Sequence, residues 1–448
     1  MATRAEKYRR RLKEPTPEKT VERAVVAKAT LKGARDSDAP LAEVTALVET
    51  AGGIVVGAVV QKIVRPHPAT FLGKGKVEEL SGLAAQLDVD AVVTDNDLSP
   101  AQARNLEKLT ERKVVDRSQL IMDIFSQRAR TRQAKLQVEL AQLKYSLPRL
   151  KRLWTHLSRF EGGIGMRGPG ETQLEEDKRI IQRRIQKLEH QLREIQSRKE
   201  TSFVHRRGEF VVAIVGYTNA GKSTLLNKLT GSHELVEDKL FATLDTRVRR
   251  WQLSENRYVL LTDTVGFIRD LPHHLVASFH ATLAETQYAD LLLHVVDASS
   301  PAAAQQMGTV REVLKSLECH TKETWVLFNK WDAIPSERLV EARHLEADLV
   351  PGERSFQISA IEGTGIERLR KALLDRLRSD DEEVDIFVPH ERGDVVAFLR
   401  QNGRIISTSY GPDGARVRAA LSPARLGKLR SLFPEGFPRP PEREEWER

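Results

Sequence analysis

The stretch GYTNAGKST, residues 216–224, constrains the fold of this chain more than any other feature. It matches the pattern GxxxxGK[ST], follows the apolar run FVVAIV at 210–215 and opens the amphipathic run KSTLLNKLT at 222–230. A strand, a glycine-rich turn and a helix in this order form a phosphate-binding loop, because backbone N–H groups and a helix N-terminus converge on one anion. We therefore expect an α/β domain with a mostly parallel sheet and flanking helices.

We predict that this loop holds a nucleotide. The backbone N–H groups of 219–223 would surround the phosphates, Lys222 would reach their outer oxygens and Ser223 would ligate Mg²⁺. The predicted contact residues of the loop are Gly216, Tyr217, Thr218, Asn219, Ala220, Gly221, Lys222, Ser223 and Thr224.

Two segments downstream are typical of the parts that sense a γ-phosphate. DTVG at 263–266 places Asp263, which can hold Mg²⁺ through water, and Gly266, whose N–H can meet the γ-phosphate. FATLDT at 241–246 offers two threonines to close on Mg²⁺, and of these we favour Thr243. The residues predicted to act in catalysis are Lys222, Thr243 and Gly266, with Mg²⁺ held by Ser223 and Thr243.

The base is predicted to be guanine. NKWD at 329–332 supplies Asn329, Lys330 and Asp332, and an aspartate can accept from both N1–H and the 2-amino group of guanine. Adenine has no donors there, so ATP would leave a buried acceptor unpaired. The run FQISA then offers Ser359 and the backbone N–H of Ala360 to the guanine oxygen. Together these motifs predict a GTPase domain that binds GTP and GDP.

Two loop positions bear on hydrolysis. Phe267 follows DTVG, where many GTPases carry a glutamine that orients the attacking water. An apolar side chain cannot polarise water, so we expect slow intrinsic hydrolysis unless a partner or another residue orients the nucleophile. Asn219 has two readings: it helps to hold K⁺ beside the phosphates, or it only braces the loop.

Residues 128–159 contain nine Lys or Arg against one acid, Glu139, an excess equal to the net charge of +8 of the whole chain. This local basic stripe indicates a polyanionic partner, or else a merely solvated helix face. Leucines at heptad spacing from Leu136, and again from Ile181, predict an antiparallel helical hairpin, kinked at Pro148. Its connecting loop FEGGIGMRGPGETQ is glycine-rich and suits close approach to structured RNA, with Arg167 meeting phosphates or bases.

The composition of the whole chain excludes several classes of protein. The chain has 448 residues, 40% hydrophobic and 30% charged, without an apolar run of the roughly 20 residues that a membrane helix needs. Its one cysteine, Cys319, excludes an internal disulfide and fits a cytoplasmic location, and no Cys/His cluster suggests zinc. The turn GKGK at 73–76 is either a phosphate site or a simple strand-to-helix corner. We expect a monomer.

The predicted architecture is a P-loop GTPase domain preceded by a small α/β domain with a long antiparallel helical hairpin, and followed by a small α+β domain. The predicted boundaries are 1–20 for a flexible N-terminus, 21–127 for the α/β domain, 128–205 for the basic hairpin, 206–378 for the GTPase domain, 379–436 for the α+β domain and 437–448 for a disordered tail.

The combination of GYTNAGKST, FATLD, DTVGFI and NKWD, preceded by GPGETQ at 168–173, resembles the HflX family of translation-associated GTPases. The resemblance implies a GTPase that docks on the large ribosomal subunit and its rRNA, and that splits or recycles ribosomes under stress. It also implies that Gly168 and Gly170 lie in a tip that probes rRNA. The RNA-binding residues expected on this basis are Arg149, Lys151, Arg152, Arg159, Arg167, Gly168 and Gly170.

Three further hypotheses remain beside that one. A GTP-gated RNA chaperone in large-subunit assembly would use hydrolysis as a timer. A GTPase acting on a membrane or regulatory protein would need an amphipathic or lipidated segment, and the sequence suggests neither. Members of the family are also reported to use ATP through the N-terminal domain, for which GKGK is the candidate cradle.

Overall fold

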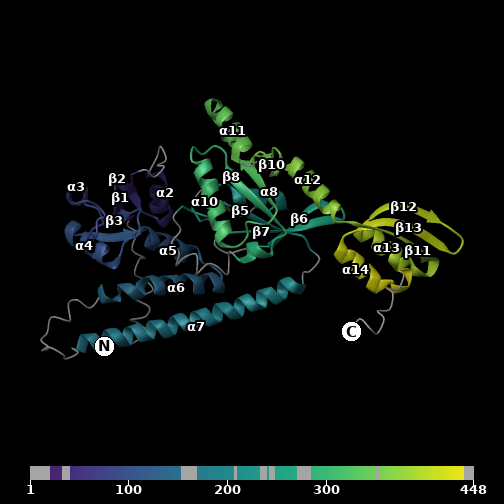
Figure 1. The fold of residues 1–448 in the computed structure, drawn as a ribbon, viewed down its shortest axis with the longest axis horizontal. Helices are drawn as coiled ribbons and strands as arrows, with labels where there is room; N and C mark the ends of the chain where they lie inside the picture. Colours follow the sequence, from purple (N-terminus) through teal and green to yellow (C-terminus); the bar gives the residue numbers. More distant parts are fainter. Residues whose placement is uncertain are drawn as a thin grey trace, which may run out of the picture. The chain divides into compact units, whose positions relative to one another are not determined.

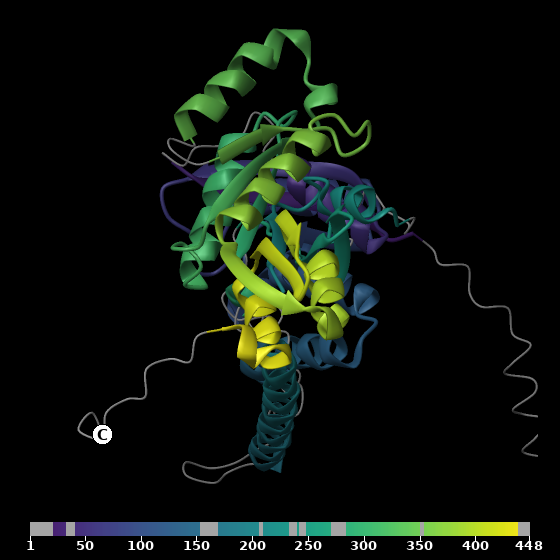
Figure 2. The same ribbon diagram turned by 90° about the vertical axis from the view of Figure 1, so that its right-hand side faces the viewer.

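The structure is a computed structural model that describes residues 21–32, 41–152, 169–205, 209–232, 240–241, 248–269, 284–349 and 354–437 (Figures 1 and 2). The chain divides into two compact units. One comprises Met1–Gln127 with Gln142–Gln182, and the other comprises Arg128–Ala141 with Arg183–Arg448.

The first unit contains a four-stranded parallel sheet in the order β2-β1-β3-β4. Its strands are β1 (Arg23–Leu31), β2 (Ile54–Ile63), β3 (Ala91–Thr94) and β4 (Lys113–Asp116), and its helices are α2 (Ala42–Ala51), α3 (Lys74–Gln86), α4 (Pro100–Thr110) and α5 (Arg117–Arg128). Ser99 caps α4 by accepting from Gln102 N, and Pro100 occupies the first helical position, which explains where this helix begins.

Two helices follow this sheet. The first, α6 (Arg132–Ser146), gives way to a 3-10 segment, η1 (Leu147–Arg152), whereas α7 (Pro169–His205) runs without interruption for 37 residues. The kink predicted at Pro148 is present as this change from α-helix to 3-10 helix. Proline lacks the N–H that an α-helix needs and clashes with the preceding turn, so the α-helix ends before it. Trp154 and Leu157, which continued the predicted seam, lie outside the described residues.

The seam predicted for α7 is present. Ile185, Leu188 and Leu192 are buried, while the intervening residues are mostly exposed. Arg184 of α7 donates to Glu139 of α6 with an N–O distance of 2.7 Å, which ties the two helices together. At 1.5 Å per residue, α7 spans about 55 Å.

The second unit contains a six-stranded sheet in the order β10-β9-β8-β5-β7-β6, in which only β6 is antiparallel to its neighbour. The strands are β5 (Val211–Gly216), β6 (Val248–Ser254), β7 (Arg257–Asp263), β8 (Leu291–Asp297), β9 (Thr324–Asn329) and β10 (Arg354–Gln357). The helices are α8 (Lys222–Thr230), α10 (Ala303–Ser316), α11 (Leu339–Leu349) and α12 (Ile366–Ser379), with 3-10 turns η2 (Ala284–Tyr288), η3 (Trp331–Ala333) and η4 (Ser336–Arg338). The central strands are buried on both faces, as parallel strands covered by helices should be.

A three-stranded antiparallel sheet in the order β11-β13-β12 follows in the same unit. It consists of β11 (Glu382–Pro389), β12 (Arg404–Tyr410) and β13 (Gly414–Leu421), with α13 (Gly393–Asn402), α14 (Pro423–Leu432) and the turns η5 (His390–Arg392) and η6 (Pro434–Gly436). Along β11, Val384, Ile386 and Val388 face the core while the residues between them are exposed. This small sheet with its helices matches the predicted α+β domain, and we call residues 381–437 the C-terminal domain.

Candidate nucleotide-binding site

The phosphate loop lies between β5 and α8, at the carboxyl edge of the six-stranded sheet. Two of its glycines are required by close approach. A Cβ on Gly216 would lie 2.3 Å from the Val295 carbonyl oxygen, and one on Gly221, whose φ is +90°, would lie 2.2 Å from Asn329 Nδ2. Asn219 has a φ of +61° and is exposed at the loop apex. The loop is therefore packed tightly on its strand side and open at its apex.

Lys222 begins α8 and is buried, and its Nζ donates to the Tyr217 carbonyl oxygen at 2.6 Å. Burial lowers the pKa of Lys222 to about 8, and the nearby Asp263 carboxylate opposes this shift. The amine is thus aimed inward across its own loop, which is where a phosphate bound by the loop would meet it.

Ser223 and Asp263 fit a magnesium ion. Ser223 Oγ donates to Asp263 Oδ2 at 3.3 Å, so a hydroxyl and a carboxylate, both hard oxygen ligands, lie side by side beneath the loop. Among the described residues, no group of three or more His, Cys, Asp or Glu is placed to hold a metal by itself. The usual Mg²⁺ site of such domains combines few protein ligands with water and substrate phosphates. Thr243 and Thr246 lie outside the described residues.

The DTVG segment is joined to the loop by backbone hydrogen bonds. Phe267 N donates to Gly216 O at 3.1 Å, and Thr218 N donates to Phe267 O at 2.7 Å. Gly266 fits here because a Cβ would lie 2.8 Å from Thr218 Cγ2 and 3.0 Å from Lys222 Nζ. The Phe267 side chain is only 2% exposed and belongs to the core.

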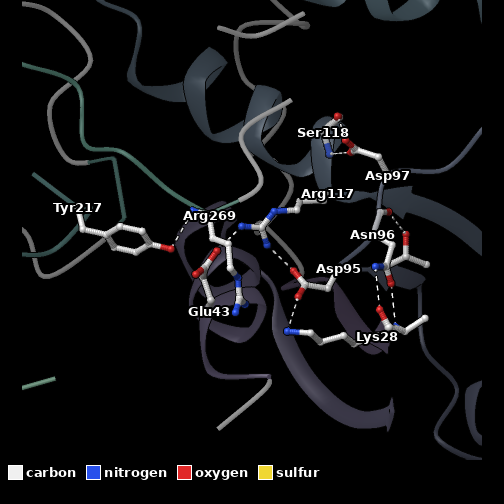
Figure 3. A network of polar contacts seen from close by, with 11 residues as sticks. Lys28, Glu43, Asp95, Asn96, Asp97, Arg117, Ser118, Tyr217 and Arg269 are labelled. Carbon is white, nitrogen blue, oxygen red and sulfur yellow. Dashed lines mark hydrogen bonds and ion pairs between the residues drawn. The ribbon is translucent and has the colours of Figure 1, made fainter. Parts of the chain in front are cut away.

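Sequence reasoning missed a further contact at this place. Arg269 N donates to the Tyr217 hydroxyl at 2.8 Å, so the phenol of a loop residue holds the backbone just beyond DTVG (Figure 3). The two residues are 52 positions apart, so no local sequence pattern predicts their contact.

Asn329 connects the phosphate loop to the predicted base-binding segment. Its Nδ2 donates to Ala220 O at 2.8 Å, and its Oδ1 accepts from Ala360 N at 3.0 Å. The Ala360 amide, predicted to reach the guanine oxygen, is thus engaged with Asn329 here. Ser359 is buried, and its Oγ accepts from Glu362 N at 3.1 Å.

The two charged residues of NKWD lie just beyond the end of β9. Asp332 is exposed in η3. Lys330 has a φ of +59°, and its Nζ lies 2.7 Å from Asp297 Oδ2 at the end of β8. Asp297 is in turn held by Ser299, whose N–H and hydroxyl both donate to its other oxygen. The sequence analysis missed Asp297, although an acidic residue closing the strand beside NKWD was a usable signal.

The residues predicted to contact RNA have mixed outcomes. Arg149 is not part of a free basic face, because its Nη2 donates to Leu98 O at 2.7 Å and to Asp116 Oδ2 at 3.1 Å. Its guanidinium also lies 3.5 Å from the centre of the Tyr145 ring, and its side chain is 15% exposed. The prediction for Arg149 is corrected accordingly, since counting charges does not reveal a buried carboxylate partner.

For the other predicted RNA contacts, the structure gives only the backbone position or no description. Lys151 and Arg152 belong to η1, and Gly170 lies in the first turn of α7. Arg159, Arg167 and Gly168 lie outside the described residues. Exposed basic residues do occur on α7, where Arg179, Arg183 and Lys187 recur every fourth position and so share one side of the helix. The stripe predicted on the preceding arm also has exposed members, Arg130, Arg132 and Lys135.

The carboxyl edge of the sheet in the first unit is filled by its own charges (Figure 3). Asp95 pairs with Lys28 at 3.1 Å and with Arg117, which also pairs with Glu43. At the GKGK turn, Gly73 is the N-cap residue of α3, and its N–H donates to Gln61 Oε1 at 2.9 Å. One of the donors that would form a phosphate cradle there is therefore already occupied by a side chain.

Comparisons with known proteins agree with this geometry. Family models match residues 38–126 (GTP-binding GTPase N-terminal), 128–206 (GTP-binding GTPase Middle Region) and 211–330 (50S ribosome-binding GTPase). The chain is 43% identical over 400 residues to GTPase HflX of Lacrimispora saccharolytica, covering 89% of this chain and 93% of that protein. It is also 43% identical over 355 residues to GTPase HflX of Escherichia coli K12, covering 79% and 82%. This chain belongs to the HflX family of GTPases.

Membership of the HflX family establishes a P-loop GTPase domain and GTP hydrolysis as its reaction. Among solved structures, the chain is similar to SsGBP in its GDP complex, with a TM-score of 0.45 and 27% identity over 80% of this chain and 98% of that one. No helix of the described part of the chain is both long and apolar enough to span a bilayer.

Proposed function

We propose that this HflX-family GTPase binds the large ribosomal subunit and couples GTP binding and hydrolysis to splitting or recycling ribosomes under stress. The observation that carries the proposal is the placement of Phe267. The residue where other GTPases hold a water-orienting glutamine is buried, and its backbone is bonded to the phosphate loop. Orientation of the nucleophile therefore has to come from elsewhere, and a bound partner is the simplest source.

Two further features support the ribosome as that partner. The family model matched by residues 211–330 is described as a 50S ribosome-binding GTPase. The exposed residues Arg179, Arg183 and Lys187 form a basic row about 12 Å long on one side of α7, which suits a polyanion such as rRNA. The glycine-rich tip with Arg167, Gly168 and Gly170 belongs to the same proposal, as does a cytoplasmic, monomeric protein.

In the proposed site each group has one task. The loop amides of 219–223 and Lys222 bind the phosphates, while Ser223 and Thr243 hold Mg²⁺, with Asp263 behind a water. When bound, Mg²⁺ neutralises charge that develops on the β- and γ-phosphate oxygens. Gly266 donates its N–H to the γ-phosphate, and Asp332 with Ser359 and Ala360 selects guanine over adenine. Asn219, exposed at the apex, is the proposed ligand for K⁺.

The first experiment measures GTP turnover by the purified protein alone and with isolated large or small ribosomal subunits, in K⁺ buffer and in Na⁺ buffer. We expect strong stimulation by large subunits only. A variant with Arg179, Arg183 and Lys187 changed to alanine should lose most of that stimulation while turnover alone is unchanged. A matched control changes three exposed arginines of the C-terminal domain: Arg404, Arg416 and Arg418. Equal stimulation by both subunits, or none, would refute the proposed partner.

A second measurement separates splitting from the alternative role in large-subunit assembly. Intact ribosomes are mixed with the protein and a non-hydrolysable GTP analogue, and subunit dissociation is followed by light scattering. Dissociation with the analogue favours splitting driven by binding, because GTP would order the switch segments and favour the bound form. Intact ribosomes under these conditions would favour the GTP-gated RNA chaperone, in which hydrolysis only times release.

A further inference from the structure

The C-terminal domain has no function assigned by any feature described so far, since the three family models end at residue 330. It lies in the same compact unit as the GTPase domain, and three hydrogen-bonded contacts connect the two at one element. That element is the β6–β7 hairpin, whose two-residue turn consists of Glu255 and Asn256.

Three groups of the C-terminal side hold this turn. Arg257, the first residue of β7, donates from Nη2 to both carboxylate oxygens of Asp381, at 2.6 Å for Oδ1. Asn256 Nδ2 donates to the Arg400 carbonyl oxygen at 3.0 Å. Arg425 of α14 donates to Asn256 O at 3.1 Å and to Asn402 O at 2.6 Å.

Of these contacts, the Arg257–Asp381 pair is largely removed from water, whereas the contacts of Asn256 with Arg400 and Arg425 are exposed. The side chain of Asp381 is 3% exposed and that of Arg257 is 14% exposed. Burial lowers the pKa of Arg425, and the charge of Arg257 lowers it further, while Glu209, Tyr258 and Asp381 oppose the shift. A charge pair removed from water is stabilised only while its geometry is kept, so a small movement of the turn changes the free energy of the interface.

The same hairpin joins the two segments predicted to sense the γ-phosphate. β6 begins at Val248, immediately after the FATLDT segment at 241–246, and β7 ends at Asp263 of DTVG. Between these ends Trp251 and Leu253 of β6 and Val259 and Leu261 of β7 are buried in the core. About 20 Å of packed, paired strand therefore connects the switch end of the hairpin to its turn.

We propose that the C-terminal domain is a regulatory module coupled to the nucleotide state through the β6–β7 hairpin. GTP and GDP place the switch ends of the hairpin differently, and the turn transmits that difference to the Asp381, Arg400 and Arg425 contacts. Coupling of this kind is reciprocal, so the interface must also change the relative affinity for the two nucleotides. The proposal goes beyond the proposed ribosomal function and requires only the nucleotide binding of the GTPase domain.

The test measures the Kd of GDP and of a non-hydrolysable GTP analogue for the full chain, without ribosomes. For Arg257→Ala we expect the ratio of the two Kd values to change about fivefold or more, the lower end of usual coupling between sites. Arg257→Lys keeps the charge but loses the two-oxygen contact, and it should give a smaller change in the same direction. The matched control is Arg418→Ala, since Arg418 pairs with Glu383 on the exposed face of the same domain, away from the hairpin.

A second measurement uses the unaltered protein, so that it does not depend on a variant folding. Hydrogen exchange of the backbone amides of β11 and α14 is compared with GDP and with the analogue. Different protection in the two complexes supports the coupling. The proposal is overturned if protection is the same, if Arg257→Ala leaves the Kd ratio within twofold of the wild-type value, or if Arg418→Ala shifts that ratio equally.

Discussion

Replacing Asn329 by alanine tests how the nucleotide site is held together. The side chain is 2% exposed and makes two hydrogen bonds, one to the Ala220 carbonyl oxygen of the phosphate loop and one from the Ala360 amide. Both partner residues are themselves buried, at 1% and 4% exposure. Their polar groups would lose partners that water cannot easily replace.

The size of the effect follows from those two orphaned groups. Each buried polar group left without a partner costs roughly 1–3 kcal/mol, so the pair costs about 2–6 kcal/mol. Because the space left by the side chain admits some water and the loops can relax, we expect the lower half of that range in nucleotide affinity. That corresponds to a GDP affinity about 30-fold to 1,000-fold weaker than that of the wild type.

The assay is calorimetric titration of GDP into the wild type, Asn329→Ala and a control, Asn402→Ala. Asn402 donates to Phe398 O at 3.0 Å within α13, so its loss removes an asparagine hydrogen bond of similar length far from the loop. Thermal unfolding without nucleotide checks that each variant is folded. A folded Asn329→Ala that binds GDP within threefold of the wild type would refute the claim that this residue braces the site.

Four other results are expected. Asp297→Asn should weaken GDP binding about threefold to tenfold, because the carboxylate positions Lys330. The same substitution should have no effect on GDP binding in a Lys330→Met background. Additive effects of the two substitutions would contradict this role of Asp297. Burial lowers the pKa of His294 to about 3, so its contribution to stability is present above about pH 6.5 and is lost as the pH falls towards 3. The loss should reach about 2 kcal/mol by pH 5 in urea unfolding and be absent in His294→Gln. Arg149→Met should destabilise the first unit by about 3–5 kcal/mol, measured by hydrogen exchange of its sheet, because it strands a buried carboxylate. Phe267→Gln should not raise single-turnover GTP hydrolysis, since the side chain lies in the core; a tenfold gain would show that the glutamine reaches the nucleotide.

The strands and the phosphate loop were predictable because their signals are local. A run such as FVVAIV followed by GxxxxGK[ST] specifies a strand, a turn and a helix within a few residues, and β5 and α8 appear as expected. The interruption in the first arm of the hairpin also has a local signal. Heptad spacing continues through Pro148, but a missing backbone donor outweighs apolar periodicity, and the α-helix ends at Ser146.

The features that sequence reasoning missed are contacts between residues far apart in the chain. Arg149 looked like one cation among nine, yet its role depends on Asp116, 33 positions away. The carboxylate of Asp297 and the phenol of Tyr217 acquire their partners only when neighbouring strands bring them together. Charge and periodicity describe a side chain's preferences, whereas its partner is set by strand order, and strand order was not predicted.

The burial of Phe267 gives a physical reason for an apolar residue beside a reaction that needs an oriented water. Phe267 and Ile268 are 2% and 0% exposed, so their side chains anchor the DTVG segment in the core while its backbone pairs with the phosphate loop. That anchoring fixes Gly266 at a position where even a methyl group would clash with Thr218 Cγ2. A glutamine there would exchange this anchoring for a buried amide whose desolvation is costly. Phe267 therefore makes the segment at the predicted γ-phosphate contact rigid, but it cannot orient a water molecule. Another group has to orient the nucleophile.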